Sequence, residues 1–204
     1  MYAVPDNVFS PSRIWTLKLG RIAKVQSTLT LTKAGGPVSY DLEGIAVRPQ
    51  GGWWVASEDA QDFGDPELTK NLLIRVEPDG SVAEEIELPA PVNQQQRSNG
   101  FEGVTTDGAG EQIYVAFQRE WADDPEGFVK IGRYTPATQE WAFYHYPLDA
   151  APVGCWVGFD GARDLLALNR DAPGDARMGI SVEAAEDGDC HARGAWGHLG
   201  EGSG

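Results

Sequence analysis

Asp41-Leu42-Glu43-Gly44-Ile45-Ala46, followed by Trp53-Trp54-Val55-Ala56-Ser57-Glu58-Asp59, is the stretch of this sequence that recurs along the chain. A second copy reads Asn99-Gly100-Phe101-Glu102-Gly103-Val104-Thr105, then Ile113-Tyr114-Val115-Ala116-Phe117-Gln118-Arg119-Glu120. A fainter copy lies within residues 155–171. The unit is an acidic residue beside a glycine, a turn, and a short apolar run that ends in charged residues.

The spacing of the copies predicts a repeated fold. The first two copies lie about 60 residues apart, slightly more than the roughly 40–50 residues of a typical propeller blade. The longer period predicts one extended loop per blade. Apolar and polar residues alternate in residues 12–19, 25–31 and 72–76, as they do in half-buried strands. We therefore expect an all-β, β-propeller-like but incomplete fold, with about three to four blades of four antiparallel strands.

Two full blades and two partial blades are predicted, at residues 40–90 and 99–148 and at residues 1–32 and 153–178. Strands of the full blades are expected at 40–47, 53–57, 72–76 and 82–88, and at 101–106, 112–117, 128–134 and 141–146. Because propellers usually close with about 4–8 blades, so few blades should leave open edges. Such edges are possible sites of self-association.

The C-terminal part departs from this plan. Whereas residues 1–178 form the propeller-like unit, residues 179–204 are rich in Gly, Ala, Asp and Glu and lack strand alternation. An irregular or disordered tail is predicted there.

The charge balance limits the kinds of partner. The net charge is −15, from 16 Lys and Arg against 31 Asp and Glu. A nucleic-acid partner is not expected, because neutralising phosphates requires clustered cations. An acidic surface could bind cations or could simply keep the chain soluble. No apolar run approaches the roughly 18 residues of a membrane span, and no basic-then-apolar signal peptide is visible in this sequence.

Strand pairing predicts an acidic rim. The first strand of a blade is antiparallel to the second, so its start meets the end of the second strand. If the turn centres on Gln50-Gly51, Glu43 and Glu58 are direct cross-strand partners. Like charges placed opposite each other are destabilising, so a cation, a shared proton or an arginine should compensate. In the next full blade, Glu102 is expected to face Gln118.

Further charged residues are expected on the same rim: Asp6, Asp59, Arg119 and Arg170. Hard oxygen ligands suit Ca²⁺ or Mg²⁺ rather than zinc. The arginines could hold an anionic group through paired hydrogen bonds. The alternative for Glu43 and Glu102 is structural, with each accepting backbone N–H bonds from a neighbouring blade. Gly44 and Gly103 should allow close packing in either case.

One aromatic residue is a candidate for ligand contact. Trp121 lies in an acidic loop, whereas Trp53, Trp54, Trp141 and Trp156 fit strand packing. Other chemistries have little support, because the chain contains no HExxH, GxSxG or P-loop motif. Two cysteines do not make a disulfide framework, and the sequence does not decide whether they form a single disulfide.

The two Glu-Gly motifs, together with Ala56-Ser57-Glu58, resemble the phytase-like family of bacterial propellers, described as having esterase-like activity of phytase. The resemblance covers roughly residues 1–178. It implies hydrolysis of a small-molecule ester or phosphoester, assisted by Ca²⁺ or another divalent cation, and a periplasmic or secreted location. The family's second strand commonly ends in Glu-Arg, whereas this chain has Gln118-Arg119 and Asn169-Arg170.

On this resemblance, the chain is expected to be a cation-assisted phosphoester or ester hydrolase with its site on the acidic rim. The catalytic residues would be Glu43, Glu102 and Arg119. The substrate-binding residues would be Arg119, Arg170 and Trp121. The cation ligands would be Glu43, Glu58, Asp59 and Glu102. The alternative is a non-catalytic module that binds a ligand or a protein partner.

Overall fold

The structure is a computed structural model that describes residues 1–5, 7–8, 10–58, 70–97, 99–148, 155–158 and 181–184. For residues 7–8, 155–158 and 181–184 it describes the backbone only. The described residues form sixteen strands and one short helix, α1 (Ala90–Asn93). Every pairing between these strands is antiparallel. The all-β prediction is therefore confirmed.

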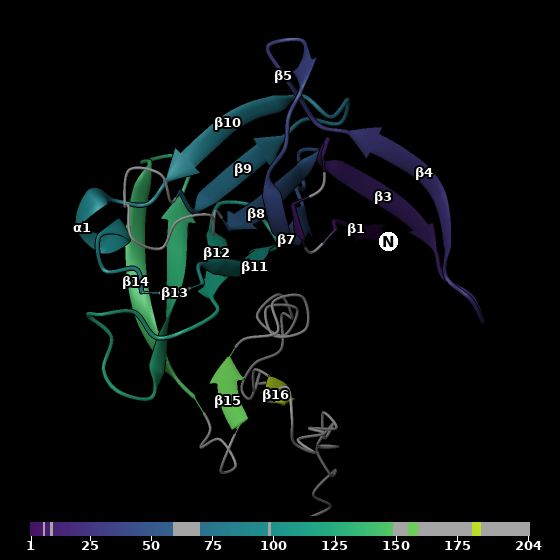
Figure 1. Ribbon diagram of the computed structural model, residues 1–204. Coiled ribbons are helices and arrows are strands. Elements are labelled where there is room, and N and C mark those ends of the chain that lie inside the picture. The colour runs from purple at the N-terminus through teal and green to yellow at the C-terminus, as the bar shows by residue number, and fades with distance from the viewer. Residues whose placement is uncertain are drawn as a thin grey trace, which may run out of the picture.

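The first sheet has the strand order β1-β3-β4 (Figure 1). Its strands are β1 (Tyr2–Ala3), β3 (Arg13–Lys18) and β4 (Lys24–Thr30). They lie in the segment predicted as a partial blade. A small hairpin, β5 (Thr32–Lys33) and β6 (Gly36–Pro37), follows.

The second sheet is a meander with one added strand, in the order β10-β9-β8-β7-β2. Its meander consists of β7 (Asp41–Val47), β8 (Trp53–Glu58), β9 (Leu72–Val76) and β10 (Val82–Glu87). The added strand, β2 (Asn7–Val8), pairs with β7 and was not predicted. The turn between β9 and β10 lies at Pro78-Asp79-Gly80, where Gly80 has a φ of 89° and Asp79 accepts the Ser81 N–H.

The third sheet repeats the meander in the order β11-β12-β13-β14. Its strands are β11 (Phe101–Thr106), β12 (Ile113–Phe117), β13 (Phe128–Thr135) and β14 (Glu140–Pro147). All eight meander strands of the second and third sheets lie within about one residue of the predicted bounds.

Two further elements were not predicted from the sequence. Helix α1 lies in the connection between the second and third sheets. In the C-terminal part, β16 (Ser181–Ala184) pairs with β15 (Cys155–Gly158); β16 lies within residues 179–204, for which an irregular or disordered tail was predicted. Four backbone pairings evidently form there without the apolar alternation on which the prediction depended.

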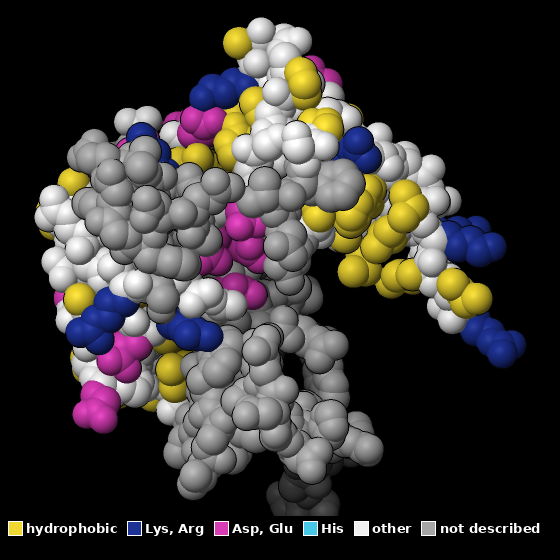
Figure 2. Space-filling model, viewed as in Figure 1, with side chains coloured by type: hydrophobic (Ala, Val, Ile, Leu, Met, Phe, Trp, Pro, Cys, Tyr) yellow, Lys and Arg dark blue, Asp and Glu magenta, His cyan; other side chains and the backbone are white. Residues whose placement is uncertain are grey.

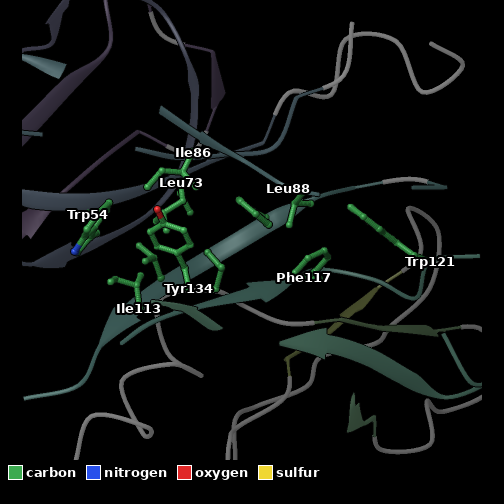
Figure 3. Close-up of a cluster of buried hydrophobic side chains, with 12 residues drawn as sticks. Trp54, Leu73, Ile86, Leu88, Ile113, Phe117, Trp121 and Tyr134 are labelled. Atoms are coloured by element: carbon green, nitrogen blue, oxygen red, sulfur yellow. The ribbon is translucent and has the colours of Figure 1, made fainter. Parts of the chain in front are cut away.

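Two buried clusters join the three larger sheets. One contains Trp54, Leu73, Phe117, Trp121 and Tyr134, with other side chains from the second and third sheets (Figure 3). The other joins Ile14 and Leu31 to β7, β8 and β9 of the second sheet. The packing in each cluster removes large apolar side chains from water. Each fully buried side chain of this kind stabilises the fold by about 1.5–3 kcal/mol.

The sheets do not close into a ring in the part of the chain that the structure describes (Figure 1). Nor does that part contain a helix with the length and apolar character needed to cross a membrane.

Candidate functional site

Glu43 lies at a β-bulge rather than opposite Glu58. In the pairing of β7 with β8, Leu42 faces Ser57 and Gly44 faces Ala56, so Glu43 is the extra residue between two paired positions. Glu58 instead faces Asp41. The predicted Glu43–Glu58 pair is therefore wrong for two reasons. The pairing next to the turn, where Val47 faces Trp53, already differs from the expected register by one residue, and the bulge shifts the register by one more. Two carboxylates still face each other, but they belong to Asp41 and Glu58.

Glu102 lies at the same kind of bulge in the third sheet. Phe101 faces Phe117 and Gly103 faces Ala116, which leaves Glu102 as the extra residue. The predicted pairing of Glu102 with Gln118 is wrong for the same reason, and the Gln118 N–H instead donates to the Gly100 carbonyl at 2.9 Å. Bulges often re-aim side chains beside active sites.

The two bulges lie side by side because glycines follow both glutamates. A Cβ atom at Gly44 would lie 2.8 Å from the Cα atom of Gly103 and 2.8 Å from the backbone nitrogen of Val104. No side chain fits at that separation. The close packing predicted for Gly44 and Gly103 is confirmed, and it brings β7 against β11.

Glu58 joins the second and third sheets. Its side chain is 6% exposed, and its Oε1 atom accepts a hydrogen bond from the Gly100 N–H at 2.7 Å. This is the structural role that we considered for Glu43 and Glu102. The sequence analysis did not consider this role for Glu58, which it expected to face Glu43.

Asn71 holds the next backbone amide. Its Oδ1 atom accepts from the Phe101 N–H at 3.0 Å, and its Nδ2 atom donates to Gln96 at 2.9 Å. The side chain is 1% exposed. A Cβ atom at Gly100 would lie only 1.6 Å from Asn71 Oδ1, so glycine is required beside this contact. Asn71 was not recognised from the sequence, where it simply follows a polar loop.

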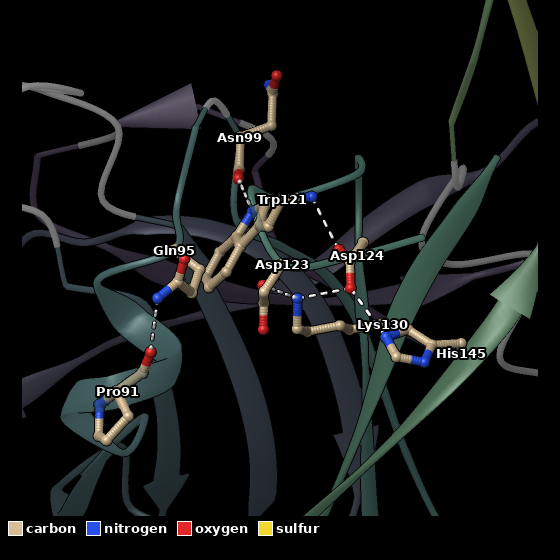
Figure 4. A network of polar contacts seen from close by, with 8 residues as sticks. All are labelled: Pro91, Gln95, Asn99, Trp121, Asp123, Asp124, Lys130 and His145. Carbon is tan, nitrogen blue, oxygen red and sulfur yellow. Dashed lines mark hydrogen bonds and ion pairs between the residues drawn. The ribbon is translucent and has the colours of Figure 1, made fainter. Parts of the chain in front are cut away.

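Trp121 is buried in the core rather than exposed at a rim. Its side chain is 0% exposed, and its ring meets Phe117 edge to face at 4.8 Å between centroids. Its Nε1–H donates to the Asn99 carbonyl at 3.0 Å (Figure 4). This burial gives no support to the expected ligand contact. The indole instead anchors the residues that lead into β11.

A buried lysine stabilises the Trp121 loop. Lys130 is 3% exposed, and its Nζ atom lies 2.5 Å from both Asp123 and Asp124 (Figure 4). Asp124 also accepts the Trp121 N–H at 2.8 Å and lies 3.1 Å from His145 Nε2. The sequence analysis described this segment only as an acidic loop. The available signal was the lysine itself, placed among apolar residues of a strand.

Acidic side chains gather over β7, β8 and β11 (Figure 2). The acidic residues of these strands are Asp41, Glu43, Glu58 and Glu102. Glu43 and Glu102 are partly buried. We call these strands and their four carboxylates the acidic face.

The described residues do not complete a metal site. None of their Asp, Glu, His or Cys side chains form a group of three or more that could hold a metal ion. One oxygen of Glu58 is also engaged by Gly100. Of the other predicted site residues, Arg119 is partly buried just after β12. Asp6, Asp59 and Arg170 lie outside the described residues.

A family model described as phytase-like, with esterase-like activity of phytase, matches residues 1–176. The chain belongs to the phytase-like family. The match spans all three larger sheets and both bulges of this phytase-like chain. Among curated proteins, none matches it significantly.

Proposed function

We propose that this phytase-like chain hydrolyses ester or phosphoester bonds of a small molecule at its acidic face. The observation that carries the proposal is the pair of adjacent bulges, which present Glu43 and Glu102 from β7 and β11. Family membership supports the reaction class. It does not by itself fix the substrate, because one fold serves many chemistries.

Two carboxylates on adjacent strands can divide the acid–base work. Mutual repulsion favours a state in which one of Glu43 and Glu102 keeps a proton and the other is ionised. The ionised carboxylate would take a proton from an attacking water, and the protonated one would give its proton to the leaving oxygen. Arg119 would hold an anionic group of the substrate through its guanidinium.

A divalent cation, with Ca²⁺ the first to test, belongs to the proposal as a partner of the acidic face. The described residues do not form a complete ligand set, so no step of the reaction is assigned to the ion. A thermal melt with excess Ca²⁺ and another with EGTA test it. An ion at a hundred times its Kd should add about 2.7 kcal/mol to the free energy of unfolding.

The proposed fold is propeller-like, with β7 and β11 nearest the axis. Its support is that two four-stranded meanders pack face to face and meet through their first strands. In this arrangement the acidic face lies where the first strands converge, which in a propeller is beside the central channel.

Hydrolysis of p-nitrophenyl phosphate and p-nitrophenyl acetate by purified protein tests the activity. Glu43→Gln and Glu102→Gln should each lower kcat/KM at least tenfold while the thermal midpoint stays close to that of the wild type. Glu140→Gln is the matched control, because Glu140 is exposed at the start of β14 and far along the sheet from β11. Full activity in both bulge variants would show that the assignment is wrong.

The second candidate is a binding module without catalysis. Gln118, directly after β12 in the third sheet, is equivalent to Glu58 at the end of β8 in the second sheet. The third sheet therefore has an amide where the second sheet has a carboxylate. Saturable binding of phosphate or acetate without turnover of either ester, abolished by Glu102→Gln or by Arg119→Gln, would favour this function.

A further inference from the structure

The hairpin between β3 and β4 has a charge opposite to that of the rest of the chain. Residues 18–24 read Lys-Leu-Gly-Arg-Ile-Ala-Lys and contain three cations and no acid. Removing these three from the 16 Lys and Arg leaves 13 against 31 Asp and Glu, so the remainder has a net charge of −18. Lys18, Arg21 and Lys24 are all exposed. An acidic surface is therefore the natural partner of this hairpin.

Apolar side chains on the same hairpin are exposed to solvent. Leu19, Ile22 and Val25 are 62%, 72% and 59% exposed. Met1 and Tyr2, which precede or begin β1 of the same sheet, are also exposed. Only Val47 and Tyr144 are comparable large apolar side chains elsewhere in the described residues. Single exposed apolar residues are ordinary, but their concentration on one element is typical of a contact surface.

The hairpin projects from the body as an arm. In Figure 1, β3 and β4 extend away from the other sheets, and β4 is the edge strand of its sheet. Figure 2 shows apolar side chains along one side of the arm and cations at its end. We call residues 15–28, together with β1, the arm. An edge strand has backbone groups that another protein can pair and that a lipid surface cannot.

We propose that the arm is the contact surface for a second copy of this chain, with the arm of each copy lying on the acidic face of the other about a two-fold axis. The two reciprocal contacts close the assembly at a dimer. Leu19, Ile22 and Val25 lose their exposed apolar surface in the contact. Lys18, Arg21 and Lys24 meet Glu43 and Glu102, the partly exposed glutamates of the acidic face, and fix the orientation.

The like net charges of two copies do not prevent this contact. At physiological ionic strength, exposed charges farther apart than about 8 Å are largely screened. Association therefore depends on the local match between the cationic arm and the acidic face rather than on the total charge. The proposal does not depend on hydrolysis and is measured without substrate.

Sedimentation velocity and light scattering over a range of protein concentrations, at about 0.15 M salt, provide the test. We expect the mass to rise with concentration and to level off at that of a dimer. Leu19→Ser with Ile22→Ser should raise the dissociation constant at least tenfold, and so should Arg21→Glu with Lys24→Glu. Val47→Ser with Tyr144→Ser is the control and should leave the constant unchanged, because these residues are similarly exposed but lie outside the arm.

A charge exchange identifies the surface that the arm contacts. A copy with Lys18, Arg21 and Lys24 changed to Glu should not dimerise alone. A copy with Glu43→Lys and Glu102→Lys should not dimerise alone either, and its cooperative melt would show that it is folded. A mixture of the two should form a heterodimer, because each arm then meets a face of opposite charge. If the second variant does not fold, the arm variants still decide the outcome.

Several results would overturn the proposal. These are a monomer up to the highest soluble concentration, self-association that the arm variants do not change, or growth beyond a dimer without a plateau. A monomer that binds vesicles containing phosphatidylserine, with binding lost in the Arg21→Glu and Lys24→Glu variant, would assign the arm to an anionic membrane instead.

Discussion

The carboxylate of Glu58 accepts a hydrogen bond from the backbone N–H of Gly100, 42 residues away in the chain, with 2.7 Å between the two atoms. The bond joins the end of β8 to the residue before β11, and both groups are buried. The next amide, that of Phe101, is held by Asn71. The segment that leads into the Glu102 bulge is therefore fixed by side chains of the neighbouring sheet.

Loss of this bond should weaken the junction between the sheets. Glu58→Ala leaves the buried Gly100 N–H without its acceptor, at a cost of about 1–3 kcal/mol in the free energy of unfolding. Glu58→Gln should cost less, because its amide oxygen can still accept. Urea denaturation measures both, with the exposed Glu140→Ala as the control. Equal midpoints for Glu58→Ala and the control would contradict the role of Glu58.

Addition of one methyl group should separate the two bulges. At Gly44, an alanine Cβ would lie 2.8 Å from backbone atoms of Gly103 and Val104, so β7 and β11 must move apart. We expect Gly44→Ala to lower stability by about 1–3 kcal/mol and to lower kcat/KM for p-nitrophenyl esters. Gly108→Ala is the control, since a Cβ there meets nothing within 4 Å. A Gly44→Ala variant as stable and active as Gly108→Ala would refute the close contact.

The ion pairs of Lys130 should differ in strength according to burial. Lys130→Met leaves the Asp124 carboxylate, which is 0% exposed, without its cation, so a loss of about 3–5 kcal/mol is expected. Asp123 is 42% exposed, so Asp123→Ala should cost less than about 1 kcal/mol. Chemical denaturation compares the two variants. Similar losses in both would mean that burial does not control this network.

Stability should fall in acid partly through Glu85. Burial opposes ionisation of this carboxyl, but hydrogen bonds from Lys33 and Tyr40 hold its pKa below the ordinary value of 4.5. A pKa depressed by folding gives stability that is present above the unfolded pKa and is lost as the pH falls through the folded value. The free energy of unfolding, measured from pH 7 to about pH 3, should therefore decline less steeply in Glu85→Gln. Parallel curves for the variant and the wild type would exclude this contribution.

The strands could be predicted from the sequence, whereas the register at the acidic face could not. The apolar run of β8 depends only on which residues are apolar, and this information is local. A bulge at Glu43 or Glu102 adds one residue without changing the composition of the strand. It therefore displaces the cross-strand partner of Glu58 and leaves no local signal.

The Trp121 loop shows a second limit of the sequence. By composition the segment with Asp123 and Asp124 is an acidic loop, and charged residues usually face water. Their partner Lys130 lies on the following strand, and only the fold brings the three charges together around a buried indole. A pattern of residue types within one segment cannot show that its charges are neutralised by another segment.

The contact between Gly44 and Gly103 makes the separation of β7 from β11 a property of the backbone alone. No side chain lies between the strands there, so substitutions among the apolar residues of the neighbouring core have no direct means of changing that separation. During evolution, the core of such a protein can therefore change sequence freely while the spacing between Glu43 and Glu102 is inherited unchanged. Selection on that spacing would act on two glycines, and divergent homologues should retain both after their cores have lost recognisable similarity.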